Sequence, residues 1–277
     1  MNNEKLLEVA ISAAVRAGAC LMESYLQVIP VTRKESSRDV ATPVDQTAER
    51  EVFALLRAYD DDISILSEEH GFQGRDNGRG HWVVDALDGT VNYLHQVPFF
   101  SVSVAYVFEG VTQVGVVYAP LVDDIYYGAR GIGAFKNQRS IASPDSSPRD
   151  SLFAATFSGK NYEPHQRQEE FALFSAVNDQ SRGCLRTGSA ALNLAYLAEG
   201  RFNGCWGKAN KAWDISAGLL LAELAGADVL VVERDAQRHL LHYLAAPTQN
   251  FEWLKGQLTS LFSVDGLAGS GMRKVES

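Results

Sequence analysis

The chain contains the stretch Trp82-Val83-Val84-Asp85-Ala86-Leu87-Asp88-Gly89-Thr90-Val91-Asn92-Tyr93, whose polarity changes abruptly after its third residue. The apolar run at 82–84 predicts a buried strand. Two aspartates follow, and a carboxylate at the end of a buried strand is unfavourable unless it is hydrogen-bonded or coordinates a cation. The Gly-Thr pair can then open a helix or a tight turn. The stretch therefore predicts a polar site at the end of a central strand.

Two interpretations fit this polar site. In the first, Asp85 and Asp88 supply the hard oxygen ligands that Mg²⁺ prefers, and the N–H groups of Gly89 and Thr90 seat an anion. That combination suits metal-assisted chemistry on a phosphate. In the second, the aspartates cap a turn and carry no chemistry, because the pattern D-x-x-D-G alone is common in loops.

Three further segments place acidic residues in a similar setting. They are Thr42-Pro43-Val44-Asp45 with Glu49, Leu66-Ser67-Glu68-Glu69-His70-Gly71, and Ala212-Trp213-Asp214-Ile215-Ser216-Ala217-Gly218. Together with the first stretch, and in the same order, they resemble the motifs of the inositol monophosphatase family of Mg²⁺-dependent, lithium-sensitive phosphatases. The resemblance runs from about Glu4 to about Phe262, with Ala86 where the family usually has Pro. Four separated motifs in order are far more specific than any one of them.

The resemblance implies the fold. It is an α/β fold (α+β in some classifications), a layered αβαβα sandwich that is usually a homodimer. We expect one domain over residues 1–277, with halves of about 1–145 and 146–277 joined near the serine-rich stretch from Pro144 to Pro148. The second half would supply Asp214 to a site built mainly by the first.

The resemblance also implies a ligand set for two or three Mg²⁺ ions. Glu68, Asp85 and the carbonyl oxygen of Leu87 would hold the first ion. Asp85 would bridge to a second ion, which Asp88 and Asp214 would also hold. An alternative for Asp214 is an acid that only compensates the dipole of the helix it starts.

The implied reaction is an in-line attack of an activated water on phosphorus, with no covalent intermediate. The hydroxyl of Thr90 and the carboxylate of Glu68 would orient the water, with Asp45 behind Thr90. The amides of Gly89 and Thr90 would contact the phosphate. Glu69 would support Glu68 or a weak third ion.

Substrate contacts are implied at two places. Lys34 matches a lysine of the family that approaches the metals from a mobile loop, although a solvated charged loop explains it equally well. The segment Thr187-Gly188-Ser189-Ala190-Ala191 resembles the family's loop and helix start that contact substrate hydroxyls. Helix capping by Ser189 is the competing explanation, and the two are compatible.

Position 207 bears on the identity of the substrate. Members that hydrolyse inositol monophosphate usually carry Glu at this position, where this chain has Gly207, with Lys208 and Lys211 close by. This difference is compatible with another sugar phosphate, histidinol phosphate or a bisphosphate as the substrate. Asn92-Tyr93, by contrast, favours the monophosphatase branch of the family. A non-catalytic regulatory member, or one that binds the RNA machinery, is the alternative class of function.

Composition bounds these expectations. The chain has 277 residues, 46% of them hydrophobic, which is enough for a large core. Its formal charge of −9 argues against a dedicated nucleic-acid binder. Cys20, Cys184 and Cys205 lack metal-binding spacing and suggest a reducing compartment without a zinc site. Residues 4–25 predict an amphipathic helix too polar for a signal peptide, so we expect a cytoplasmic protein.

Local patterns predict mixed α and β structure. Thr42 and Pro43 predict a helix start, and Glu49 is expected only to compensate the dipole of that helix. Strands are predicted at 63–66, 101–108, 111–118, 124–129, 134–141, 153–157, 202–206 and 229–232, and helices at 165–177, 189–198, 213–225 and 248–262.

Overall fold

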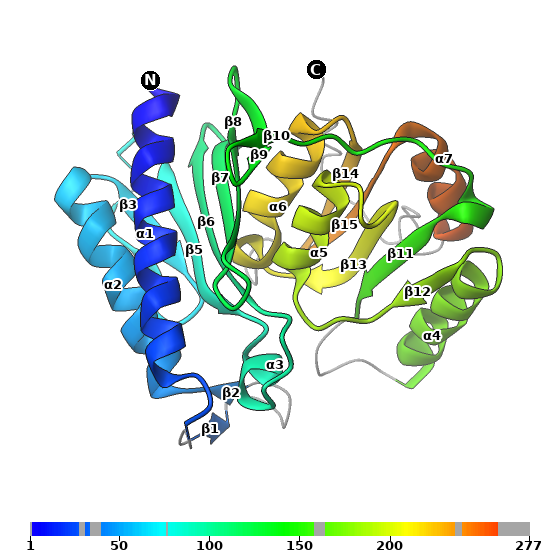
Figure 1. Ribbon diagram of the computed structural model, residues 1–277, viewed down its shortest axis with the longest axis horizontal. Helices are drawn as coiled ribbons and strands as arrows, with labels where there is room; N and C mark the ends of the chain where they lie inside the picture. Colours follow the sequence, from blue (N-terminus) through cyan, green and yellow to red (C-terminus); the bar gives the residue numbers. More distant parts are fainter. Residues whose placement is uncertain are drawn as a thin grey trace.

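Two β-sheets and three helical layers alternate through the molecule (Figure 1). The computed structural model describes residues 2–27, 31–33, 40–75, 77–157, 164–235 and 240–259. Helices α1 (Asn3–Ser24) and α2 (Pro43–Tyr59) cover the outer face of the first sheet, α5 (Ala190–Ala198) and α6 (Ala212–Leu224) lie between the sheets, and α4 (Pro164–Asp179) and α7 (Thr248–Gln257) cover the second sheet. This order of layers is the predicted αβαβα sandwich.

The first sheet has eight strands in the order β10-β9-β8-β7-β6-β5-β3-β4. Within it, β3 and β5 run parallel, and the other neighbouring strands are antiparallel. The strands are β3 (Ser64–Ser67), β4 (Gly71–Gln73), β5 (His81–Asp88), β6 (Ser101–Phe108), β7 (Val111–Ala119), β8 (Asp124–Ala129), β9 (Gly133–Lys136) and β10 (Arg139–Ser140). The short helix α3 (Thr90–Leu94) follows β5, and β1 (Thr32–Arg33) and β2 (Val40–Ala41) form a separate hairpin.

The second sheet has five strands in the order β12-β11-β13-β15-β14. They are β11 (Leu152–Thr156), β12 (Gly183–Leu185), β13 (Gly204–Asn210), β14 (Asp228–Asp235) and β15 (Leu240–Ala246), and the 3-10 helix η1 (Pro148–Asp150) precedes β11. The chain crosses from the first sheet to the second between Ser140 and Leu152, a segment that contains the predicted boundary.

The layers are held together by separate apolar clusters on the two faces of the first sheet. Alternating residues of β5 show this, because Val84 packs toward α1 and α2 whereas Val83 packs toward α5 and α6. Gly115 of β7 allows close approach between the sheet and α6, since a Cβ there would lie 2.8 Å from the carbonyl oxygen of Ala217. The first sheet and α6 are therefore in direct backbone contact.

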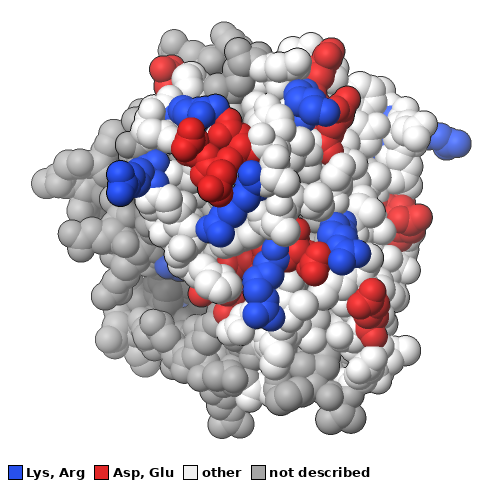
Figure 2. Space-filling view, turned by 90° about the vertical axis from the view of Figure 1, so that its left-hand side faces the viewer, with Lys and Arg blue, Asp and Glu red and all other residues white. Residues whose placement is uncertain are grey.

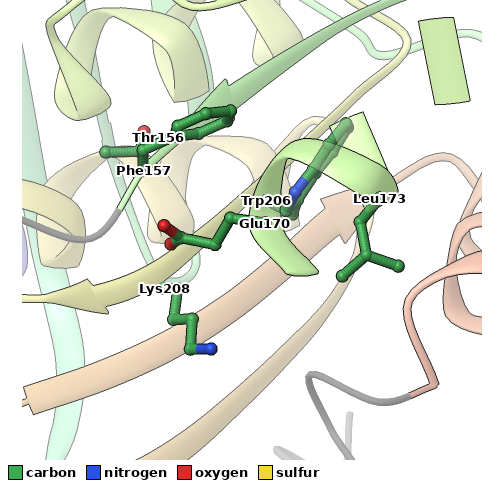
Figure 3. A pocket seen from close by; sticks show the side chains of 6 residues that line it. All are labelled: Thr156, Phe157, Glu170, Leu173, Trp206 and Lys208. Carbon is green, nitrogen blue, oxygen red and sulfur yellow. The ribbon is translucent and has the colours of Figure 1, made fainter. Parts of the chain in front are cut away.

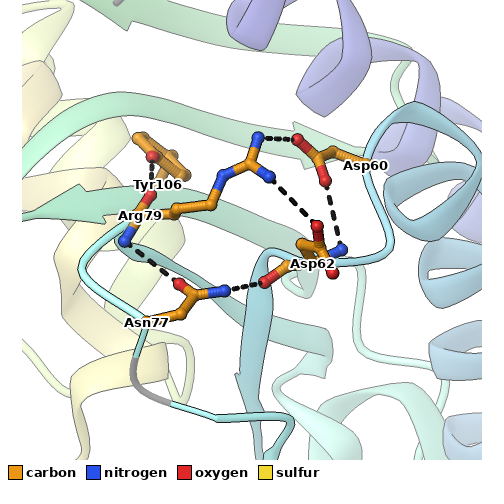
Figure 4. Close-up of polar contacts among 5 residues, drawn as sticks. All are labelled: Asp60, Asp62, Asn77, Arg79 and Tyr106. Carbon is orange, nitrogen blue, oxygen red and sulfur yellow. Dashed lines mark hydrogen bonds and ion pairs between the residues drawn. The ribbon is translucent and has the colours of Figure 1, made fainter.

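Polar contacts fix the end of the first sheet that lies opposite the predicted site (Figure 4). The guanidinium of Arg79 pairs with Asp60 and, at 3.3 Å, with Asp62. The Asn77 side chain donates to the carbonyl oxygen of Asp62 at 2.6 Å, and the Tyr106 hydroxyl donates to that of Arg79. These bonds connect the segments that precede β3 and β5. They therefore help to fix the register of the two parallel strands.

Most predicted elements are present, with shifted ends. The predicted strand at 134–141 is wrong as a single element, because Asn137 and Gln138 adopt positive φ and form a two-residue hairpin turn between β9 and β10. The predicted strand at 202–206 lies later, at Gly204–Asn210, and β4, β12 and β15 were not predicted. Residues 260–262 of the last predicted helix lie outside the described residues.

The charged side chains on the face built by α1 and α2 are of mixed sign (Figure 2). Arg16 pairs with Glu51 at 2.7 Å and Lys5 with Glu8 at 2.9 Å, and all four side chains are at least one-third exposed. This view therefore shows no continuous basic surface. None of the helices in the described part of the chain is both long enough and apolar enough to span a membrane.

Candidate active site

The end of β5 contains a β-bulge that places both of its aspartates on one face. Asp85 pairs with Ser103 and Asp88 with Ser101, so three steps on β5 match two steps on β6. In a regular strand, residues three apart point to opposite faces, and the extra residue of a bulge removes this alternation. Ala86 and Leu87 accordingly pack toward α1 and α2, which leaves both carboxylates toward the middle helical layer. Asp85 and Asp88 are both buried.

Asp88 is held by the N-terminus of α5, which belongs to the other half of the chain. The Ser189 hydroxyl donates to Asp88 Oδ2 at 2.5 Å, and the amide of Ala191 donates to the same oxygen at 2.8 Å. Ser189 is also the N-cap of α5, because its hydroxyl accepts from the amide of Leu192 at 3.2 Å. The capping explanation of Ser189 is confirmed, and the same hydroxyl joins the two halves.

Asp214 reaches the same region from the first turn of α6. Its Oδ2 accepts the amide of Lys211 at 2.8 Å, so it caps its helix. The hydroxyl of Ser103, the residue paired with Asp85 across the sheet, donates to the carbonyl oxygen of Trp213 at 3.1 Å. That bond places the start of α6 directly against the end of β5.

Glu68 lies in the turn between β3 and β4 and is half-buried. Burial, together with the charges of Glu68, Asp88 and Asp214, raises the pKa of Asp85 well above its ordinary value. Burial and the charges of Asp88 and Glu68 likewise raise the pKa of Asp214. The predicted ligands Glu68, Asp85, Asp88 and Asp214 are therefore close enough to repel one another.

Asp88 shows how burial and hydrogen bonding compete. Burial raises the pKa of Asp88 to about 6, although the bonds from Ser189 and from the amides at the start of α5 act in the opposite direction. A proton or a cation relieves the repulsion in such a group of acids.

Thr90 stands beside these acids and is held by two partners. Its hydroxyl lies 3.2 Å from Asp45 Oδ1 and 3.2 Å from the carbonyl oxygen of Leu87. Asp45 is buried at the first turn of α2, where it forms a capping box with Thr42, and burial raises the pKa of Asp45. Gly89 adopts a φ of +100° and gives the chain the sharp change of direction that starts α3. The predicted arrangement of Asp45 behind Thr90 is present.

Glu49 is placed differently from the sequence expectation. It is the seventh residue of α2, beyond the first turn on which the helix dipole acts, and only 1% of it is exposed. The hydroxyl of Ser67, the amide of Glu69 and the ring of His70 are all hydrogen-bonded to its carboxylate. The interpretation as dipole compensation is therefore wrong, and Glu49 instead holds the turn that contains Glu68.

The segment at 187–190 lies against the helix that follows β5. The side chain of Asn92 donates to the carbonyl oxygens of Thr187 at 2.8 Å and Phe99 at 2.7 Å. Gly188 has a φ of +99°, and a Cβ there would lie 2.8 Å from Asn92 Nδ2. Asn92 therefore positions Gly188, Ser189 and Ala190 beside the end of β5.

Gly207 is packed so tightly that a side chain at this position would require Asn210 or Tyr243 to move. A Cβ built on it would lie 2.2 Å from Asn210 Oδ1 and 2.4 Å from Tyr243 Cε1. Tyr243 is fully buried, and its hydroxyl lies 3.2 Å from that of Thr156. No sequence motif predicted Tyr243, because β15 itself was not predicted. The space beside position 207 is thus filled by Asn210 and Tyr243, and neither of them is an acid.

The remaining basic residues named from the sequence are placed as follows. Lys208 lines a small pocket together with Thr156, Phe157, Glu170, Leu173 and Trp206, and none of the predicted ligands lines it (Figure 3). Lys208 Nζ lies 3.7 Å from Glu169, and Lys211 Nζ lies over the ring of Trp213. Lys34 lies outside the described residues.

The four acids Glu68, Asp85, Asp88 and Asp214 are chemically suited to bind a divalent cation. Its side chains are all carboxylates, the oxygen donors that Mg²⁺ selects, and their mutual repulsion is what a cation would remove. In the described ranges, however, no three Asp, Glu, His or Cys side chains are already arranged as a metal-binding group. Each aspartate directs one oxygen to a backbone amide: Asp85 to that of Leu87, Asp88 to that of Ala191 and Asp214 to that of Lys211.

Comparisons with known proteins identify the family. The sequence pattern described as "Inositol monophosphatase family" matches residues 2–259. Nus factor SuhB of Haemophilus influenzae is 35% identical over 251 residues, which are 88% of this chain and 92% of that protein. Inositol-1-monophosphatase of Mesorhizobium japonicum is 37% identical over 235 residues, 83% of this chain and 86% of that protein. The relatives thus carry names of two different kinds.

Solved structures confirm the fold. The inositol monophosphatase of Anabaena (Nostoc) sp. PCC 7120 is 32% identical and superposes with a TM-score of 0.80 over 94% of this chain and 98% of its own. An IMPase/NADP phosphatase complexed with Mg²⁺ and phosphate has the same fold at 20% identity, with a TM-score of 0.78 over 99% of this chain and 100% of its own. By its matched pattern and its relatives at 35% and 37% identity, the chain belongs to the inositol monophosphatase family.

Proposed function

We propose that the protein is a Mg²⁺-dependent phosphomonoesterase that hydrolyses a small sugar or polyol phosphate. One observation carries the proposal: Glu68, Asp85, Asp88 and Asp214, from three distant segments, share one charged region beside Thr90. Repelling acids at the junction of two halves reduce the stability of a protein without a cation. Binding a cation would offset this repulsion and so accounts for the presence of the four acids.

In this proposal, Glu68, Asp85 and the Leu87 carbonyl oxygen hold one Mg²⁺, and Asp85, Asp88 and Asp214 hold another. Bound Mg²⁺ supplies positive charge that neutralises phosphate oxygens and acidifies water. The similarity to a fold that has been solved with Mg²⁺ and phosphate supports this choice of ion and ligand.

The protein's own groups would then orient the reactants. The Thr90 hydroxyl, held by Asp45 and Leu87, would accept a hydrogen bond from the attacking water or pass a proton toward Asp45. The amides of Gly89 and Thr90 would contact the phosphate oxygens. Ser189 would keep Asp88 in place while the segment at 188–190 contacts the alcohol portion of the substrate.

The lack of an acid at position 207 supports a monophosphate whose recognition does not need a carboxylate there. Asn210 and Tyr243 fill that position, so an incoming hydroxyl would meet no carboxylate there. We therefore rank sugar or polyol monophosphates other than inositol monophosphate first, and histidinol phosphate, fructose bisphosphate and nucleotide bisphosphates after them. We also predict a cytoplasmic homodimer, whose mass light scattering would measure.

A second candidate function rests on the relatives named Nus factor SuhB. One of them is 35% identical over 88% of this chain, so a non-catalytic role in a transcription complex is a real alternative. Retention of all four acids of the proposed site favours the enzyme.

A panel of phosphate esters would separate the two functions. The purified protein is assayed for phosphate release with Mg²⁺, without Mg²⁺ and with added Li⁺. We expect Mg²⁺-dependent hydrolysis that Li⁺ inhibits, and loss of turnover in Asp88→Asn with the fold intact. Absence of hydrolysis across the panel, or near-normal turnover by Asp88→Asn, would reject the phosphatase.

A further inference from the structure

Helix α2 carries two buried carboxylates one helical turn apart, and each is bonded to a different segment of the site. Asp45 accepts from the Thr90 hydroxyl at the end of β5. Glu49 accepts from the turn between β3 and β4, which contains Glu68. The helix thus contacts both segments of the first half that would supply metal ligands.

The contacts of Glu49 lie on both sides of Glu68. The Ser67 hydroxyl donates to Glu49 Oε1 at 2.5 Å, and His70 Nδ1 lies 2.6 Å from the same oxygen. The amide of Glu69 donates to Glu49 Oε2 at 3.2 Å. Ser67 and Glu49 are both buried, so the bond between them is shielded from water. The backbone at position 68 is therefore fixed between bonded neighbours.

This support is needed because the sheet stops before Glu68. The last pair between the parallel strands β3 and β5 is Ser67 with Val84, and β3 turns back into β4 immediately afterwards. Ladder bonds alone therefore do not set the distance from Glu68 to Asp85. A helix advances by about 5.4 Å per turn and is rigid on that scale, so Asp45 and Glu49 can define it.

We propose that Glu49 is a positioning residue for the metal site: with Asp45, it uses one turn of α2 to fix Glu68 relative to the end of β5. The inference rests on the proposed function, because it concerns the Mg²⁺ that Glu68 would hold. Removing a residue that orients a metal ligand typically changes metal affinity or activity by about 10–100-fold.

A carboxylate is specifically suited to this position. The three donors from 67, 69 and 70 converge on the two oxygens of Glu49. A glutamine has one oxygen and one NH₂ group, which would face the Glu69 amide or the pair at Oε1 as donor against donor. Glu49→Gln therefore keeps the size of the side chain, but the new side chain cannot accept all three hydrogen bonds from the turn.

The test compares Glu49→Gln with Glu51→Gln, an identical change on the same helix. Glu51 is one-third exposed, and its carboxylate pairs with Arg16 of α1 and not with the turn that contains Glu68. Mn²⁺ binding to metal-free protein is measured by calorimetry, and the Mg²⁺ dependence of kcat is measured on the best ester of the panel. Hydrogen exchange reports the amides at 68–70.

We expect Glu49→Gln to bind the ion held by Glu68 about 10–100-fold more weakly, with kcat rescued by high Mg²⁺ and with faster exchange at 68–70. Glu51→Gln should match the wild type in all three. A folded Glu49→Gln whose Mn²⁺ affinity and Mg²⁺ dependence stay within about twofold of wild type overturns the inference, even if its melting temperature falls.

Three further results would also decide the inference. If Glu49→Gln does not fold, Ser67→Ala removes one of the three bonds, and unchanged Mn²⁺ affinity in that variant overturns the inference. If the wild type binds no divalent cation, the proposed function fails and the inference fails with it. If the wild type binds Mn²⁺ but hydrolyses nothing, only the phosphatase is rejected, and the Mn²⁺ comparison still decides the role of Glu49.

Discussion

Asp88 and Ser189 are 101 residues apart in the sequence, yet the Ser189 hydroxyl donates to the Asp88 carboxylate at 2.5 Å. Asp88 ends a strand of the first sheet, and Ser189 begins a helix of the middle layer. One carboxylate thus serves both as a joint between the halves and as a proposed metal ligand. The proposed metal site and the contact between the halves therefore share the Asp88–Ser189 hydrogen bond.

Removing this joint should weaken both roles. Ser189→Ala deletes the N-cap of α5 and one hydrogen bond to a buried carboxylate, so we expect a loss of about 2 kcal/mol in the free energy of unfolding. Urea denaturation measures it. Ser147→Ala, which deletes a surface bond to Asp150, should change stability by less than about 0.5 kcal/mol. Equal effects of the two changes would show that the Asp88–Ser189 bond has no special weight.

The stability of the metal-free protein should fall as pH rises. The pKa of Asp88 is raised by burial from 3.8 to about 6, so the folded chain retains a proton that the unfolded chain has lost between those values. The group is neutral in both states below pH 3.8 and unfavourable to folding above about pH 6. The pKa values of Asp85 and Asp214 are also raised, so these groups have the same effect on stability.

Asp88→Asn should therefore be more stable than wild type in EDTA at high pH, by about 3 kcal/mol, and show a flatter pH profile. Added Mg²⁺ should stabilise the wild type above pH 6 and leave Asp88→Asn nearly unchanged. Denaturation curves with EDTA and with Mg²⁺ across this range give the comparison. A wild type that gains stability with rising pH in EDTA relative to Asp88→Asn would disprove the electrostatic account.

Thr90 should contribute through its hydroxyl. Thr90→Val retains the shape of the side chain but removes the bonds to Asp45 and Leu87, and we expect kcat to fall about 10²–10⁴-fold with a smaller change in KM. Thr90→Ser keeps the hydroxyl and should retain most of the activity. Steady-state kinetics at saturating Mg²⁺ measure both. A Val variant that turns over as fast as the Ser variant would exclude the hydroxyl from the reaction.

A side chain at position 207 should destabilise the protein unless the Asn210 side chain is shortened. Gly207→Ala places a Cβ against Asn210 and Tyr243 and should destabilise the protein by about 1–3 kcal/mol. Adding Asn210→Ala should recover part of that loss, which a double-mutant cycle measures. Gly256→Ala, in open space on helix α7, should instead stabilise by roughly 0.5–1 kcal/mol. Additive effects at 207 and 210 would contradict the packing.

The sequence motifs located the acids but not the geometry that brings them together. Asp85 and Asp88 were found because they follow an apolar run, whereas the bulge that places both on one face depends on pairing with β6. The role of Glu49 was missed because its three donors lie 18 to 21 residues further along the chain. Long-range pairing leaves no local pattern, so these features became visible only in the folded chain.

Strand β15 illustrates a second limit. Leu240–Ala246 lacks the alternation of polar and apolar residues that marks a strand, because its central residues are buried from both sides. Because this strand was not predicted, the contact of Tyr243 with Gly207 was not predicted either. By contrast, the capping residues Thr42 and Ser189 were readable from sequence, since capping is a local interaction.

The central claim is that carboxylates from both halves bind one pair of cations. Diffraction from crystals grown with Mn²⁺ and phosphate, recorded at the manganese absorption edge, tests it most directly. We predict anomalous peaks bounded by Asp85, Asp88 and Asp214, with one further coordinated by Glu68 and the Leu87 carbonyl oxygen, and phosphate next to Thr90. Ordered crystals with no anomalous density between Asp214 and the end of β5 would contradict the account.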